Sequence, residues 1–267
     1  MLSAVEGEVE SQPRCPHHPA REAVRTCERC GRYVCSWCEH DGGQCRDCVR
    51  LSVLAVPDSR ARARWTLRLL EVAAGVSLLK VPLFFWVFIA LEESGRVPGP
   101  LVDGVTYLSL LFALAAQVGF LMWVHRVVRQ LKAQGADLET TPAMAVWMWL
   151  IPLLNWVKPY QLMKDIAEKA GGAHFAASLP LSLWWGANLL ARVLEQVDQR
   201  VVRKMGTVEG VPSSASLVFA IFMSLCSAGT ALACVQIVKA LQARMDQRRE
   251  GLEGVDTPIA EDEATAA

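Results

Sequence analysis

Long runs of apolar residues dominate this chain from residue 69 onward, and they constrain its fold more than any other feature. A helix needs about 20 apolar residues to cross a bilayer. Four runs approach or reach that length and predict membrane spans at about 69–91, 105–124, 179–195 and 215–238. The composition agrees, because 52% of the 267 residues are hydrophobic and only 20% are charged. The sequence therefore predicts a mostly α-helical, multi-pass membrane domain over residues 69–244.

A fifth apolar run, residues 143–163, is interrupted by Pro152, Asn155, Lys158 and Pro159. Such a run predicts either a broken, re-entrant element or a crossing helix whose polar groups are satisfied inside the protein. Positive charge collects on the cytoplasmic side of membrane proteins. That rule favours the re-entrant element, which keeps the lysines of this region on one side with the arginines before the first span. The crossing alternative stays open, and with it the side on which the C-terminus lies.

Four polar side chains lie within or beside the apolar runs and form a possible intramembrane site: Lys80, Asn155, Lys158 and Asn188. A charge at mid-depth costs about 2.5–3.5 kcal/mol on insertion scales, so it needs compensation. One interpretation is that Lys80 binds carbonyl groups freed by Pro82 and by the broken element. The other is a small-molecule or ion site at the break, as in transporters with discontinuous helices.

Four pairs of metal-binding residues precede the apolar part: Cys15-x2-His18, Cys27-x2-Cys30, Cys35-x2-Cys38 and Cys45-x2-Cys48. Each pair brings two ligands to one metal ion, and two pairs complete a tetrahedral zinc site. The four pairs therefore predict two zinc ions. The short gap between the second and third pairs favours crossed pairing, in which the first and third pairs hold one ion and the second and fourth hold the other. Sequential pairing is the alternative, His17 could replace His18, and His40 is expected to be solvated.

The predicted zinc-binding module, residues 13–50, is too short for a hydrophobic core of its own. Tyr33, Val34 and Trp37 are its main apolar residues. Domains of about 40 residues usually need metals or disulfides for stability, and eight protein ligands leave no coordination position open for catalysis. Both zinc ions are therefore expected to be structural. We expect a disordered leader at 1–12, a basic linker at 51–68 and a disordered tail at 245–267.

The remaining features exclude several classes of function. The charges balance, with 27 basic and 27 acidic residues, so no nucleic-acid partner is expected. We find no nucleophile elbow, phosphate loop, zinc-protease motif or dinucleotide turn, which predicts a non-enzymatic protein. The first residues lack a secretory signal, which predicts a cytoplasmic N-terminus. We expect a bilayer-embedded protein whose residues 13–50 bind a protein partner; the alternative is a transporter or channel-like protein using Lys80 and Asn155.

Two resemblances follow from these motifs. The cysteine and histidine spacing of residues 13–50 resembles a B-box-type zinc finger, whose pattern implies the cross-brace, although Cys45-x2-Cys48 stands where that family usually has two histidines. Residues 65–245 resemble the bacterial membrane domain of unknown function 4328, which implies a location in the bacterial inner membrane. The residues that carry this second resemblance are Trp123, Arg126, Gly135, Pro142, Trp147, Pro152, Asn155, Pro159, Tyr160 and Trp185.

Overall fold

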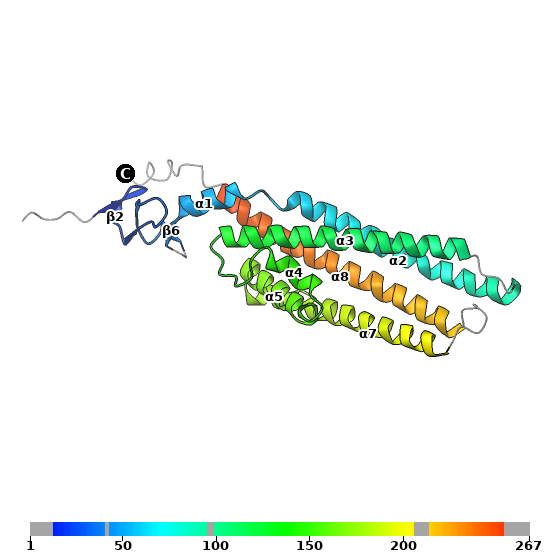
Figure 1. Ribbon diagram of the computed structural model, residues 1–267. Helices are drawn as coiled ribbons and strands as arrows, with labels where there is room; N and C mark the ends of the chain where they lie inside the picture. Colours follow the sequence, from blue (N-terminus) through cyan, green and yellow to red (C-terminus); the bar gives the residue numbers. More distant parts are fainter. Residues whose placement is uncertain (1–12, 41–42, 95–98, 206–213, 254–267) are drawn as a thin grey trace, which may run out of the picture. The chain divides into compact units, whose positions relative to one another are not determined.

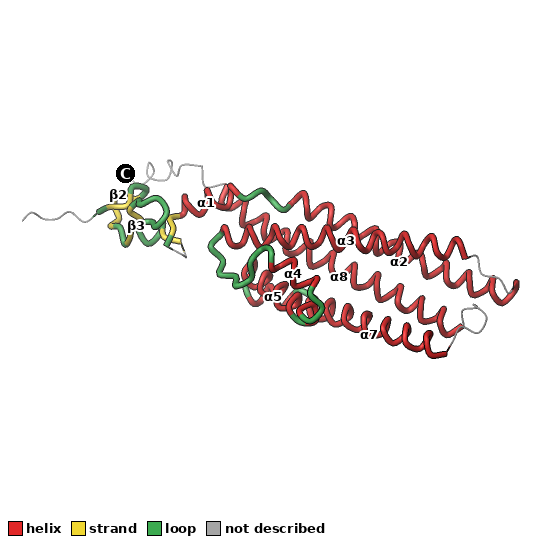
Figure 2. The backbone as a smooth tube through the Cα atoms, viewed as in Figure 1, coloured by secondary structure: helices red, strands yellow, loops and turns green. Residues whose placement is uncertain are grey.

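The computed structural model describes residues 13–40, 43–94, 99–205 and 214–253, and Figures 1 and 2 show their helices and strands. The chain forms two compact units. The first holds the described residues up to Pro57, the short segment Lys132–Asp137 and the last two described residues. The second holds Asp58–Leu131 and Leu138–Gly251. We call them the Cys-rich unit and the helical unit.

The Cys-rich unit consists of three two-stranded antiparallel hairpins and one helix. The hairpins pair β1 (Arg14–Cys15) with β2 (His18–Glu22), β3 (Arg25–Thr26) with β4 (Tyr33–Val34), and β5 (Glu39–His40) with β6 (Gln44–Cys45), and α1 (Arg46–Ala55) follows. Six of its cysteines and Val34 form the buried centre. Tyr33 and Trp37, which we grouped with Val34 as the main apolar residues, are instead exposed. Sulfur atoms therefore occupy the place of a hydrophobic core.

The helical unit has four long helices and a group of short ones. The long helices are α2 (Arg60–Ser94), α3 (Gly99–Ala133), α7 (Leu181–Met205) and α8 (Ser214–Glu253). The short elements between α3 and α7 are α4 (Met144–Leu150), η1 (Leu154–Trp156), α5 (Lys158–Gly171) and α6 (Ala173–Ser178). These lie at the end of the unit where α2 and α7 begin and where α3 and α8 finish (Figure 1). We call this the α5 end.

Residues 143–163 form a broken element, not a continuous helix. The seven residues of α4 extend about 10 Å at 1.5 Å per residue, far less than the roughly 30 Å of a hydrocarbon core. Ile151 leaves the helical conformation immediately before Pro152, as expected for a residue that precedes proline. The chain thus returns from α3 to α7 at one end of the unit (Figure 1), and the re-entrant path through a membrane stays a prediction.

Three helices of the described chain are long and apolar enough to cross a membrane: Arg60–Ala90, Gly99–Ala133 and Val218–Gly251. They belong to α2, α3 and α8, which contain three of the four spans predicted from sequence and extend beyond them. The fourth predicted span, at 179–195, belongs to α7, which is not among the three. Polar residues explain the difference, because Asn188, Arg192, Glu195 and Gln196 interrupt its apolar run.

Two boundaries differ from the sequence prediction. The linker expected at 51–68 is mostly helical, because α1 continues to Ala55 and α2 begins at Arg60. Ala63, Thr66 and Leu70 lie buried along one face of α2, whereas its arginines occupy other positions. Residues 245–253, which were expected to belong to a disordered tail, are helical, since α8 continues to Glu253. The predicted leader at 1–12 and the tail at 254–267 lie outside the described residues.

A buried amide joins three helices at the α5 end. The Oε1 atom of Gln242 on α8 accepts hydrogen bonds from Trp123 Nε1 on α3 at 2.9 Å and from Ser59 Oγ, just before α2, at 3.1 Å. The Nε2 atom of Gln242 donates to Asp246 Oδ1 at 2.8 Å, and Asp246 pairs with Arg60 Nε at 3.0 Å. Both polar ends of a buried side chain are therefore satisfied, which buried amides require.

Replacing Gln242 with leucine should destabilise the helical unit. The change Gln242→Leu leaves the Trp123 and Ser59 donors buried without an acceptor, and each unsatisfied buried group costs about 1–3 kcal/mol. Thermal unfolding of the purified protein in detergent should show a clearly lower midpoint. The control is Lys239→Gln, which breaks the exposed Lys239–Glu71 ion pair and should change the midpoint little. Equal midpoints for both variants would contradict the structural role of the amide.

Candidate metal centre

The first group of ligand atoms brings together the first and third pairs: Cys15, His18, Cys35 and Cys38. All four atoms lie within 4.8 Å of one another. His18 Nδ1 lies 3.2 Å from Cys38 Sγ and 3.5 Å from Cys35 Sγ, and the Sγ atoms of Cys15 and Cys38 are 3.7 Å apart. The Nδ1 atom of His18 is thus the nitrogen that faces the sulfur atoms.

The second group brings together the second and fourth pairs: Cys27, Cys30, Cys45 and Cys48. Its four sulfur atoms also lie within 4.8 Å of one another, and the Sγ atoms of Cys30 and Cys45 are 3.7 Å apart. The structure therefore has the crossed arrangement, and sequential pairing would need ligands from different groups. His17 lies outside both groups, with its Nε2 atom 2.9 Å from Asp47 Oδ2.

Local turns bring the paired cysteines together. Cys27 and Cys30 lie in the turn between β3 and β4, where Gly31 has a φ of +69° and its N–H donates to the Cys27 carbonyl at 2.8 Å. Glycine adopts this left-handed conformation without the strain that a side chain causes. Cys45 is the N-cap of α1, and its Sγ accepts from the Cys48 N–H at 3.4 Å. The helix start thus positions the fourth pair.

The sulfur spacing fits a tetrahedral metal ion. Zinc–sulfur bonds of about 2.3 Å place the sulfur atoms of a tetrahedron roughly 3.8 Å apart, close to both measured Sγ–Sγ distances of 3.7 Å. A disulfide would require about 2.05 Å, and all the cysteines of the chain are free. Two clusters of four ligands each could hold metal ions. Neither leaves a coordination position for a substrate if all four ligands bind.

The pKa values indicate why a cation would stabilise these groups. Burial raises the pKa of Cys38 to about 12, aided by hydrogen bonding and charge repulsion from Cys15 and Cys35. Burial also raises the pKa of Cys15, but hydrogen bonds from the Cys35 N–H and the His18 side chain outweigh it and lower the pKa to about 6. The second group shows the same division, with the pKa of Cys27 lowered to about 6 and that of Cys48 raised to about 12 by burial and hydrogen bonding. Without a cation, clustered thiolates repel one another.

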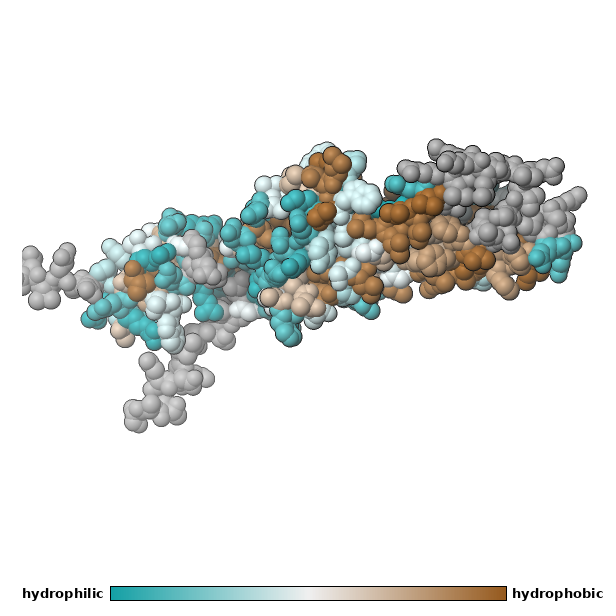
Figure 3. Space-filling model, turned by 90° about the horizontal axis from the view of Figure 1, so that it is seen from below, coloured by the Kyte–Doolittle hydropathy of each residue, from teal (hydrophilic) through white to brown (hydrophobic). Residues whose placement is uncertain are grey.

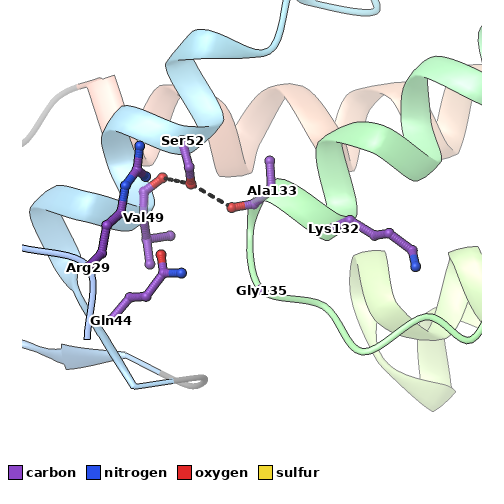
Figure 4. A pocket seen from close by; sticks show the side chains of 7 residues that line it. All are labelled: Arg29, Gln44, Val49, Ser52, Lys132, Ala133 and Gly135. Carbon is purple, nitrogen blue, oxygen red and sulfur yellow. Dashed lines mark hydrogen bonds between the residues drawn. The ribbon is translucent and has the colours of Figure 1, made fainter. Parts of the chain in front are cut away.

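A pocket of about 240 Å³ lies in the Cys-rich unit, and none of the eight ligands is among the residues that line it (Figure 4). Ser52 Oγ lies within hydrogen-bond distance of the carbonyl oxygens of Val49, at 2.7 Å, and Ala133, at 2.8 Å. The Lys132 side chain points away from Ser52 in this view. Arg29, Gln44 and Gly135 complete the lining. Its two cations do not converge, so the pocket does not define a ligand.

The four polar residues predicted for an intramembrane site are not joined to one another. Asn188 Nδ2 donates to the Trp184 carbonyl of its own helix at 2.8 Å. Lys158 is exposed at the start of α5, and Lys80 is half-buried on α2. The Oδ1 atom of Asn155 is buried without a hydrogen-bond partner among the described residues. No hydrogen bond or ion pair of the described chain links any two of the four, and the intramembrane site stays a prediction.

Sequence reasoning missed two features of the described chain. The exposed Trp37 ring lies under the Arg21 guanidinium, 3.9 Å from ring centroid to Cζ. The buried Gln242 network is the other. A sequence signal for Gln242 was present, because Val235, Val238 and Met245 lie seven and four residues before it and three after it, on the same face of a helix. For Trp37 the sequence offered no signal, because its position inside a Cys-x2-Cys pair does not reveal which way the ring points.

Cobalt substitution should distinguish the crossed arrangement from sequential pairing. With both sites loaded, Cys35→Ser/Cys38→Ser should leave one ion with four cysteine ligands, because the second group is intact. Sequential pairing would instead leave three cysteines and one histidine. The visible absorption of Co²⁺ reports the number of thiolate ligands. The control Cys226→Ser changes a cysteine outside both groups and should retain both ions.

Metal uptake near pH 7 should release protons. Metal ligands must be deprotonated, and the raised pKa values of Cys38 and Cys48, about 12, keep these thiols protonated at that pH without metal. Affinity should therefore fall as the pH falls, because protons compete with the metal for every thiolate. Calorimetric titration of the metal-free protein with Zn²⁺ in buffers of different ionisation enthalpy measures the released protons. A heat that does not depend on the buffer would contradict this expectation.

Comparison with known proteins identifies the helical part. The model of a family described as domain of unknown function (DUF4328) matches residues 100–243, which is 144 of 267 residues. This match begins later than the resemblance at 65–245 suggested, and it identifies no zinc-finger family for residues 13–50. No curated protein and no solved structure matches the chain. Because the matched region covers more than half of its length, the chain belongs to the DUF4328 family.

Proposed function

We propose that this chain is a non-enzymatic integral membrane protein whose Cys-rich unit, held by two structural zinc ions, recruits a protein partner on the cytoplasmic side. The helical unit anchors the chain in the bilayer through its long helices. Recruitment at the membrane surface is then the task of the Cys-rich unit. The proposal explains why one chain combines a small metal-binding module with helices long and apolar enough to cross a membrane.

The closed ligand groups support a structural role for the metal. Catalytic zinc sites usually have three protein ligands and keep a position for water or substrate, whereas structural sites are closed by four. Each group here offers four ligand atoms, and seven of the eight side chains are buried or partly buried. The metal would therefore stabilise the hairpins and leave their outer surface for binding.

The observation that carries the proposal is the exposed aromatic platform on the Cys-rich unit. Trp37 is 67% exposed although it lies between two buried ligands, Cys35 and Cys38. The Arg21 guanidinium lies 3.9 Å from its ring centroid, and His18 meets it edge-on at 6.2 Å. Tryptophan and arginine are enriched among the residues that contribute most to protein–protein binding. A ring fixed on a metal-stabilised frame loses little conformational freedom when a partner covers it.

Charge distribution supports a cytoplasmic position for the α5 end. Most basic side chains of the helical unit belong to this end: Arg60, Arg62, Arg64, Arg68, Arg126, Arg129, Lys158, Lys164, Lys169, Arg244, Arg248 and Arg249. The opposite end carries Arg200, Arg203 and Lys204 on α7, together with Glu92 and Glu93 on α2. Arginine and lysine near the ends of membrane helices favour the cytoplasmic side.

Truncating the exposed ring should remove the partner without removing the metal. In affinity purification of the intact protein from detergent, Trp37→Ala should lower partner recovery roughly tenfold or more, because truncating a central tryptophan costs about 2 kcal/mol or more. Its zinc content should stay at that of the unaltered protein. Cys27→Ser/Cys30→Ser should lose both the partner and one ion.

The matched control for this experiment is Leu51→Ala. Leu51 is 61% exposed on α1 of the same unit, but it has no ring and no stacked arginine. The Leu51→Ala substitution should change neither the recovery of the partner nor the zinc content. If Trp37→Ala recovers the same proteins as the unaltered chain, the platform does not recruit them and the proposal fails.

A further inference from the structure

The segment from α4 to η1, residues 144–157, exposes an unusual concentration of large apolar side chains. Leu153 is 88% exposed and Trp147 is 58% exposed. The exposed large apolar residues of the segment are Met144, Trp147, Leu150, Ile151, Leu153, Trp156 and Val157. Single exposed apolar residues are ordinary, but a contiguous group marks an interaction surface. We call this group the α4–η1 face.

The opposite side of the same segment is fixed to the helical unit. Trp149 meets Phe120 edge-on at 5.2 Å and Trp185 at 5.7 Å. The Nε1 atom of Trp185 donates to the Trp156 carbonyl at 3.0 Å. Met148 and Trp149 are buried. The exposed side chains are therefore held outward by a packed aromatic layer.

The backbone of the segment limits the depth at which it can lie in a membrane. Irregular backbone exposed to lipid does not occur within the hydrocarbon region, because its polar groups would lack hydrogen bonds there. The chain leaves helical geometry at Ile151 and again at Val157. Such a segment fits the boundary between headgroups and acyl chains, where water reaches the backbone and apolar side chains extend about 5–10 Å inward.

The helix that follows the segment, α5, has one buried apolar face and one exposed polar face. Its inner face is buried through Leu162, Met163 and Ile166. Its outer face is polar and exposed, with Lys158, Gln161, Lys164, Asp165 and Lys169. The surface therefore changes from apolar to charged between Val157 and Lys158. On the face of the molecule shown in Figure 3, hydrophilic residues gather at the α5 end of the helical unit, and hydrophobic residues spread from there toward its other end.

We propose that the α4–η1 face binds phospholipid, inserting into the headgroup–acyl boundary of the leaflet next to the α5 end, with Lys158 at the level of the phosphates. Tryptophan and lysine are the side chains that anchor proteins at this level. The face is continuous in sequence with the charged surface of α5. The lysines of that surface suit an anionic bilayer surface. In an apolar contact between two copies of the chain, those lysines would have no partners of opposite charge. This inference rests on the proposed anchoring of the helical unit in a bilayer, but not on the partner proposed for the Cys-rich unit.

Photo-crosslinking in liposomes tests the proposal. The intact protein carries p-benzoyl-phenylalanine in place of Leu153, whose exposure makes the change compatible with folding. The matched control carries it in place of Lys164, on the exposed polar face of α5. Both proteins are reconstituted into phosphatidylcholine vesicles with and without phosphatidylglycerol, irradiated, and analysed by mass spectrometry for lipid and protein adducts.

The expected result is a several-fold higher yield of phospholipid adducts at position 153 than at position 164, rising further when phosphatidylglycerol is present. Equal lipid yields at the two positions would overturn the proposal, and so would a predominant adduct with a second copy of the chain. Failure of the protein to enter the vesicles would overturn it as well. A second variant, Leu153→Asp, should lower the adduct yield of a probe placed at Leu150 several-fold. An unchanged yield would also count against insertion.

Discussion

Three helices long and apolar enough to cross a membrane indicate the constraint that governs the helical unit: hydrocarbon offers no hydrogen bonds to peptide groups, so only backbone that satisfies its own hydrogen bonds can lie in it. The helices α2, α3 and α8 pair their backbone groups internally over 35, 35 and 40 residues, except where Pro82 of α2 lacks a backbone donor. The short elements α4, η1, α5 and α6 between α3 and α7 lie at the α5 end (Figure 1). The buried polar network of Gln242 also lies there, and it joins the three longest helices where charged residues become frequent.

The stability of the Cys-rich unit has a different physical basis. Its hairpins have strands of two to five residues, and Val34 is the one aliphatic residue in its buried sulfur centre. Burial of so little apolar surface cannot offset the conformational entropy of ordering the chain. Metal binding supplies the missing free energy in small domains of this kind. The exposed Trp37 ring is consistent with this fold, because cysteine sulfur atoms fill the buried centre and no aromatic ring is needed there.

The sequence predicted features that depend on local spacing. The Cys-x2-Cys and Cys-x2-His pairs indicated both ligand groups, and the length of the apolar runs indicated the three longest helices. Features that depend on packing were not predictable in the same way. The arginines before Leu69 suggested a linker, although Ala63 and Thr66 are buried on a helical face. The apolar start of α7 suggested a full span, although Asn188 and Glu195 interrupt it. The direction of the Trp37 ring and the hydrogen-bond partners of Gln242 could be determined only from the three-dimensional fold.

The sulfur atom of Cys45 has two roles, as a candidate metal ligand and as the cap of a helix. Cys45 Sγ lies in the second ligand group and also accepts the hydrogen bond that caps α1. A thiolate bound to metal keeps its negative charge at the helix start, where the positive end of the helix dipole favours it. Loss of the ion would allow protonation of the thiol and weaken the cap in the same event. The first turn of α1 would then fray when the second ligand group loses its metal ion. By thermodynamic linkage, the helix content of this turn would report how far that group is occupied by metal.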